Sequence, residues 1–173
     1  LDGTYNYFRG IKNCGICIAL CLRDKPVVGV INDFFNDRIL YGVDGIGSFI
    51  DFDGKTEKIE LEPSASIGQS ALATGYPVSR DFSQSSFVKF NKVTASFKKV
   101  RMFGSASISL CSVLLDHVDC YWEESIMWWD VAAGLAIINA AGGYISVSPT
   151  SKEFCYDVVA TNNKLLVDFI QED

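Results

Sequence analysis

Hydrophobic and polar positions follow two different patterns along the chain, and the change comes after residue 62. Before it, short apolar runs are separated by turn signals such as Asp53-Gly54, which is typical of strands joined by tight hairpins. These runs predict strands at 14–22, 27–31, 38–41, 48–52 and 55–61. The first third of the chain is therefore expected to form a mostly antiparallel sheet.

After residue 63, short apolar runs alternate with longer segments that have helical spacing. Phe87, Phe90, Val93 and Phe97 recur every three or four residues and predict a helix over 85–97. The same reasoning predicts strands at 71–74, 100–103, 118–122, 144–147 and 158–161, and helices at 106–115, after 130 and at 164–170. This alternation favours an α/β sheet covered by helices. We expect two parts, 1–62 and 63–173, of one layered α/β fold.

The most apolar stretch follows Asp130 and ends at Gly142-Gly143, a typical helix stop. It is apolar nearly all round, which predicts a buried helix. Asp130 is the only charged residue between Glu124 and Lys152, and a carboxylate there is costly unless something neutralises it. It could cap the helix or bind a metal, and this stretch alone leaves both open.

Composition excludes several classes of partner. The 173 residues suffice for one domain with a sizeable core. The net charge of −6 provides no basic surface for a phosphate backbone, so no nucleic-acid partner is expected. No apolar run is long enough to span a membrane, so no membrane partner is expected either.

Six cysteines raise the question of a metal cluster. Cys14, Cys17 and Cys21 lie in an apolar run that is typical of a buried strand, without the second cysteine pair of a zinc site. The single histidine, His117, follows an apparent helix, where a histidine is commonly structural. We expect buried free thiols in a reducing, cytoplasmic environment and no cysteine or serine nucleophile.

Three polar groups lie where elements are expected to end. They are Asp2-Gly3-Thr4, Gly104-Ser105-Ala106-Ser107, and Glu123-Glu124 followed by Asp130. Each has a simple structural explanation: a turn, a serine helix cap, and a solvated acidic face. Together they describe an acidic, glycine-lined pocket suited to a divalent metal and a phosphate.

Two of these groups resemble the signatures of the inositol monophosphatase family. Leu1-Asp2-Gly3-Thr4-Tyr5-Asn6-Tyr7-Phe8 resembles the tail of its Asp-Pro-Ile/Leu-Asp-Gly-Thr-x-Asn-Phe motif. Trp129-Asp130-Val131-Ala132-Ala133-Gly134, closing in Ala141-Gly142-Gly143, resembles the second signature. The resemblance implies the C-terminal portion of a layered αβαβα sandwich, with an antiparallel sheet followed by a mixed one. It also makes Asp130 a metal ligand rather than a cap.

The resemblance implies Mg²⁺-dependent hydrolysis of a phosphate monoester, with inositol monophosphate as the default small phosphorylated substrate. Asp2 would bridge two metal ions, the carbonyl oxygen of Leu1 would add a ligand, and Asp130 would hold the second metal. Thr4 would also orient the attacking water. The residues that would bind the phosphate or the rest of the substrate are Gly3, Thr4, Gly104, Ser105, Ala106 and Glu123.

The family motif also contains an aspartate before the position of Leu1 and a glutamate further upstream, both metal ligands that this sequence lacks. The chain therefore resembles the C-terminal part of such an enzyme, without its N-terminal helices, and is expected to be inactive alone. Family members are often homodimers. Alternative substrates are adenosine 3′,5′-bisphosphate and fructose 1,6-bisphosphate, for which Arg101 is a nearby cation. Two further hypotheses are a non-catalytic binding module and an inactive fragment.

Overall fold

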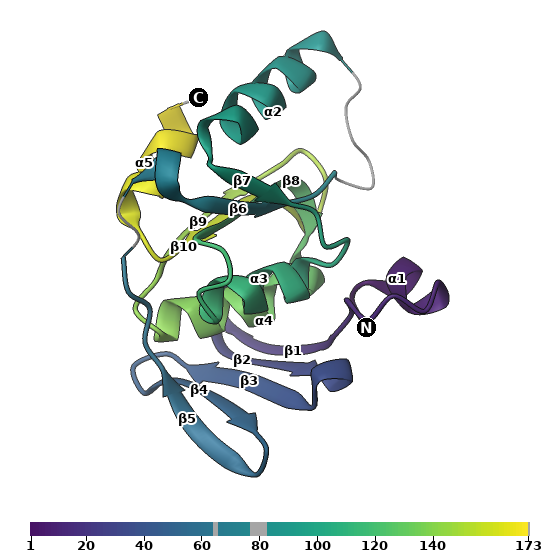
Figure 1. Cartoon of the computed structure of the whole chain (residues 1–173), viewed down its shortest axis with the longest axis vertical. Coiled ribbons are helices and arrows are strands. Elements are labelled where there is room, and N and C mark those ends of the chain that lie inside the picture. Colours follow the sequence, from purple (N-terminus) through teal and green to yellow (C-terminus); the bar gives the residue numbers. More distant parts are fainter. Residues whose placement is uncertain (64–65, 77–82, 173) are drawn as a thin grey trace.

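The computed structural model describes residues 1–63, 66–76 and 83–172. These residues form four stacked layers (Figure 1): a first sheet, a layer of two helices, a second sheet, and two further helices on its outer face. The α/β architecture predicted from the sequence is confirmed. The layers matter for function because the two helices between the sheets carry polar residues at their N-termini.

The first sheet is antiparallel, with its five strands side by side in chain order, as the hairpin signals predict. Its strands are β1 (Ile16–Leu22), β2 (Lys25–Asp33), β3 (Arg38–Val43), β4 (Gly47–Phe52) and β5 (Lys55–Ile59). The expectation that the 14–22 run is buried is wrong for most of β1. Ile18 and Leu20 are 66% and 61% exposed. The apolar pattern identified a strand, but β1 lies at the edge of this sheet with no described element covering these side chains.

The second sheet is mixed and has the order β7-β6-β8-β10-β9. Its strands are β6 (Ala71–Thr74), β7 (Lys99–Arg101), β8 (Cys120–Met127), β9 (Tyr144–Pro149) and β10 (Cys155–Thr161). Strand β6 runs parallel to both β7 and β8, whereas β10 is antiparallel to β8 and β9. The end of β6 lies beside the middle of β8, with Thr74 opposite Trp122.

Helices α3 (Ala106–Leu114) and α4 (Trp128–Ala140) fill the space between the sheets. Helices α2 (Gln84–Ser96) and α5 (Lys164–Glu172) cover the outer face of the second sheet, and α1 (Thr4–Phe8) is a short N-terminal helix. Helix α4 lies almost directly on β2. A Cβ added at Gly29 would stand 2.1 Å from the carbonyl oxygen of Ala133, so only glycine permits this contact between backbones.

Two element boundaries differ from the predictions in ways that affect the site. Strand β8 continues five residues beyond the predicted end at 122, passing through a bulge at Ser125, which has a left-handed φ of 55°. The backbone N–H of Ser125 donates to the Asp157 carboxylate at 2.8 Å and holds the bulge. Helix α4 then begins at Trp128, so Asp130 lies inside its first turn rather than before it.

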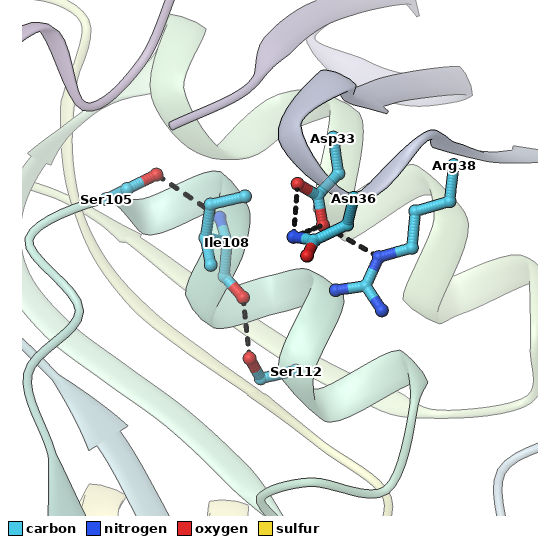
Figure 2. Close-up of polar contacts among 6 residues, drawn as sticks. All are labelled: Asp33, Asn36, Arg38, Ser105, Ile108 and Ser112. Carbon is cyan, nitrogen blue, oxygen red and sulfur yellow. Dashed lines mark hydrogen bonds and ion pairs between the residues drawn. The ribbon is translucent and has the colours of Figure 1, made fainter. Parts of the chain in front are cut away.

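A buried ion pair supports α3 from the side of the first sheet (Figure 2). The carboxylate of Asp33, at the end of β2, is fully buried and accepts a 2.7 Å hydrogen bond from Arg38 Nε. Asn36 Nδ2 donates to the same carboxylate at 2.9 Å. Beside this group, the Ser105 hydroxyl accepts from the backbone N–H of Ile108 at 3.3 Å and caps α3.

All six cysteines are free thiols, and Cys14, Cys111, Cys120 and Cys155 are buried. The prediction of free thiols is confirmed, although Cys21 is exposed. No helix in the described part of the chain is both long enough and apolar enough to cross a membrane.

Candidate active site

All nine residues singled out from the sequence line one cavity of about 660 Å³. Its walls come from the N-terminal segment, the ends of β6 and β8, and the starts of α3 and α4. The nine residues are Leu1, Asp2, Gly3, Thr4, Gly104, Ser105, Ala106, Glu123 and Asp130. Segments that are far apart in the sequence therefore converge at the place where their combined chemistry was expected.

The N-terminal segment is held in place by its backbone. Asp2 and Gly15 exchange two backbone hydrogen bonds, of 2.9 and 3.2 Å. Gly3 then turns the chain with a φ of 75°, and a Cβ there would lie 2.7 Å from the Asn13 carbonyl oxygen. Glycine is needed at this position both for the left-handed backbone and for the close approach. The turn leaves Thr4 exposed as the first residue of α1.

Asn6 joins this segment to the loop before α3, a role that the sequence analysis missed. Its buried Nδ2 donates to the carbonyl oxygens of Asn13 and Phe103, each at 2.8 Å. It also reaches the carbonyl oxygen of Gly104 at 3.2 Å. The available signal was an asparagine between aromatic residues in the first signature, but spacing alone does not reveal which carbonyl groups it binds.

The N-terminus of α3 holds an anion that belongs to the protein itself. Asp2 Oδ2 accepts hydrogen bonds from the Ser105 hydroxyl at 2.5 Å and from the backbone N–H of Ser107 at 2.8 Å. The predicted anion-binding property of this segment is thus used by a carboxylate. Ser105 serves both as the helix cap and as a tether for Asp2.

Glu123 and Glu124 form a pair in sequence only. Glu124 makes a 2.6 Å ion pair with Lys89, whereas Glu123 is 8% exposed, so the solvated-face explanation is wrong for Glu123. Its Oε2 accepts a 3.0 Å hydrogen bond from the Tyr121 hydroxyl. Burial raises the pKa of Glu123 to about 7, the Tyr121 hydrogen bond lowers it, and the charges of Asp2 and Asp130 raise it.

Asp130 is half-buried in the first turn of α4. The N-cap position belongs to Met127, which makes no side-chain cap, so the interpretation of Asp130 as the cap is wrong. Burial, followed by repulsion from the Asp2 carboxylate, raises the pKa of Asp130 to about 6. Asp2, Glu123 and Asp130 therefore bring three carboxylates to one cavity.

A family model described as the inositol monophosphatase family matches residues 1–166. The chain belongs to the inositol monophosphatase family. It is 32% identical to inositol monophosphatase 3 of Solanum lycopersicum over 99% of the chain and 64% of that protein. It is 31% identical to the inositol-1-monophosphatase of Synechocystis over 95% of the chain and 57% of that protein.

A solved inositol monophosphatase from Anabaena (Nostoc) superimposes with a TM-score of 0.85 and is 30% identical, over 98% of this chain and 70% of that one. The chain thus corresponds to a C-terminal portion of its inositol monophosphatase relatives. It spans between 57% and 64% of the length of the two curated relatives named above.

The family in general depends on Mg²⁺, and the cavity offers oxygen donors that suit this ion. Mg²⁺ prefers oxygen ligands and is usually bound by one or two carboxylates plus water and substrate phosphate. Asp2 and Asp130 provide two carboxylates, and after burial the charge of Asp2 is the next cause that raises the pKa of Asp130. The described residues contain no group of three or more His, Cys, Asp or Glu side chains that could hold a metal ion, so water and substrate oxygens would have to complete the coordination. This donor set fits a partly hydrated Mg²⁺.

Proposed function

We propose that the protein hydrolyses the phosphate monoester of a small polyol, with inositol monophosphate as the substrate, in an Mg²⁺-dependent reaction. The observation that carries the proposal is the convergence of Asp2, Glu123, Asp130 and the start of α3 on one cavity. Because the chain spans only part of its relatives' length, the activity is proposed for the natural full-length protein.

Each of the chain's own groups has a distinct task in this proposal. Bound Mg²⁺ would neutralise the phosphate and lower the pKa of a coordinated water. Asp2 and Asp130 would hold the metal, together with the carbonyl oxygen of Leu1. The Thr4 hydroxyl, exposed at the cavity wall, would bind the phosphate and orient the attacking water. Glu123 would accept a hydrogen bond from a substrate hydroxyl.

The cavity lining favours a substrate with one phosphate. Among the described residues that line it, none is lysine or arginine. Arg101 is exposed and is not among them, and its guanidinium donates to the carbonyl oxygen of Val100 at 3.0 Å. A second phosphate would therefore face an acidic wall with no lysine or arginine side chain among its described residues, which disfavours fructose 1,6-bisphosphate and adenosine 3′,5′-bisphosphate.

The test is phosphate release by the full-length protein from inositol 1-phosphate, with Mg²⁺ and with EDTA. We expect turnover that needs Mg²⁺ and exceeds turnover of either bisphosphate. Absence of turnover on all three substrates would overturn the proposal. Isothermal titration with Mg²⁺ and inorganic phosphate would then distinguish a non-catalytic binding module, which gives heat, from an inactive fold, which gives none.

A further inference from the structure

Glu123 is fixed by two neighbours that no part of the proposed chemistry uses. Tyr121, two residues earlier on β8, is fully buried in the core between the second sheet and helices α3 and α4. Its hydroxyl donates to Glu123 Oε2 at 3.0 Å. Both side chains point to the same face of the strand, as residues two apart must. The Tyr121 side chain thus extends from the core to Glu123, which lines the cavity.

Gly75, after the end of β6, forms the second contact. A Cβ added there would lie 2.7 Å from Glu123 Oε2 and 3.0 Å from Oε1. The carboxylate therefore rests directly against the backbone of Gly75, in space that any side chain would occupy. Because β6 and β8 are neighbouring parallel strands, this contact is a consequence of their register, in which Thr74 lies opposite Trp122.

The two contacts leave one oxygen of Glu123 for a ligand. Tyr121 engages Oε2, while Oε1 accepts no hydrogen bond from any residue that the structure describes. Oε1 is not among the fully buried side-chain atoms that lack a partner, so it is accessible from the cavity, where a substrate hydroxyl can donate to it. A site built to hydrogen-bond a substrate hydroxyl discriminates against analogues that lack it.

We propose that Tyr121 is a positioning residue that holds the Glu123 carboxylate against Gly75, so that the free Oε1 recognises one hydroxyl of the polyol phosphate. The inference rests on the proposed function and deepens it, because it makes substrate selectivity depend on a residue that does not touch the substrate. This effect on selectivity distinguishes the proposed role of Tyr121 from that of a purely structural core tyrosine. A structural role would weaken the reaction of every substrate equally.

The experiment uses the full-length protein with two substrates, inositol 1-phosphate and 4-nitrophenyl phosphate, the second of which has no hydroxyl to recognise. We expect Tyr121→Phe to lower kcat/KM for inositol 1-phosphate about tenfold more than for 4-nitrophenyl phosphate, chiefly through KM. Glu123→Gln should give the same selective loss. The double variant should lose no more selectivity than Glu123→Gln alone, because the two residues act as one unit.

The matched control is Tyr41→Phe, which removes another tyrosine–carboxylate hydrogen bond, of 3.2 Å to Asp51, in the other sheet. It should change neither substrate's kinetics. Equal losses on both substrates in Tyr121→Phe, or no loss on either, would overturn the inference while leaving the phosphatase proposal intact. A wild-type protein that neither cleaves nor binds either substrate would overturn both.

Discussion

The Asp2 carboxylate accepts a hydrogen bond from the backbone N–H of Ser107, 105 residues further along the chain, at 2.8 Å. This contact ties the first signature to the start of α3 and uses the positive end of that helix to hold a negative charge. The same oxygen, Oδ2, accepts from the Ser105 hydroxyl. The helix therefore fixes the orientation of Asp2 before any metal binds.

Asn6→Ala should loosen the joint between the N-terminal segment and the loop before α3. The substitution leaves the carbonyl oxygens of Asn13 and Phe103 without their donor, which should cost about 1–3 kcal/mol of unfolding free energy. Chemical denaturation measures this loss. Asn139→Ala is the control, since Asn139 donates to Asp44 on the surface, and it should change stability little. Equal stability of the two variants would contradict the assignment.

Arg38→Met should leave the fully buried Asp33 carboxylate without its positively charged partner. Among the described partners of that carboxylate, Asn36 would remain. Removing one member of a buried pair typically costs about 3–5 kcal/mol. Lys25→Met breaks the exposed pair of Lys25 with Asp44 and should change stability little, because solvent screens an exposed pair. Denaturant midpoints compare the two variants, and a loss for Arg38→Met no larger than for Lys25→Met would argue against a structural role for the pair.

Thr74→Val should stabilise the protein. The Thr74 hydroxyl oxygen is buried and has no hydrogen-bond partner among the described residues, so an isosteric apolar side chain removes an unsatisfied group worth about 1 kcal/mol. We expect a melting temperature higher by about 2–4 °C. Thr161→Val is the control and should lower the melting temperature, because the buried Thr161 hydroxyl donates to the Asp119 carbonyl oxygen at 2.7 Å. A lower melting temperature for Thr74→Val would reveal a partner for the hydroxyl.

Asp130→Asn should separate function from stability. Loss of a charged metal ligand should reduce turnover of inositol 1-phosphate by orders of magnitude. In EDTA the same substitution should raise the melting temperature at pH 7, because it removes a partly buried charge repelled by Asp2. Asp168→Asn, on the exposed surface beside Lys164, should change neither the turnover nor the melting temperature. Wild-type turnover in Asp130→Asn would rule out the ligand assignment.

The raised pKa values of Glu123 and Asp130, about 7 and about 6, predict a pH dependence for the metal-free protein. An acid whose folded pKa exceeds its unfolded pKa binds protons more tightly when folded, so it destabilises the fold as pH rises. The double variant Glu123→Gln/Asp130→Asn should therefore gain stability relative to wild type from about pH 4 to 7 and then level off. Melting temperatures in EDTA across this pH range compare the double variant with the wild type. If the difference between the two melting temperatures did not change with pH, the pKa values of Glu123 and Asp130 would not be raised.

Turn signals and helical spacing are local properties, so they predicted the strands and helices of an α/β fold. The layered sandwich and the shared site of Asp2, Ser105, Glu123 and Asp130 were implied by the resemblance to the family signatures. The sequence could not predict the burial of Glu123, which depends on β8 continuing past its expected end. The bulge that permits this uses Ser125 rather than a glycine, so no turn residue marks it. The hydrogen bonds of Asn6 and Tyr121 were likewise missed, since they join elements whose register is set by tertiary packing.

The exposure of β1 was unpredictable for a related reason. Its apolar residues do specify a strand, but alternation and length do not say whether another element covers them. Asp130 illustrates the opposite case. The residues around it left the cap and the metal ligand open, and only the start of α4 at Trp128 removed the first of these two roles.

The cavity walls come from four segments spread between residues 1 and 130, with Asp2 and Asp130 in different signatures. Contacts this distant in sequence carry the loop-closure cost of long chain segments, and non-local contacts of this kind slow folding. A partly folded molecule with only the first sheet in place has no such cavity and cannot capture a metal ion there. Under the proposed Mg²⁺ dependence, a bound ion would therefore stabilise only molecules in which the cavity has formed.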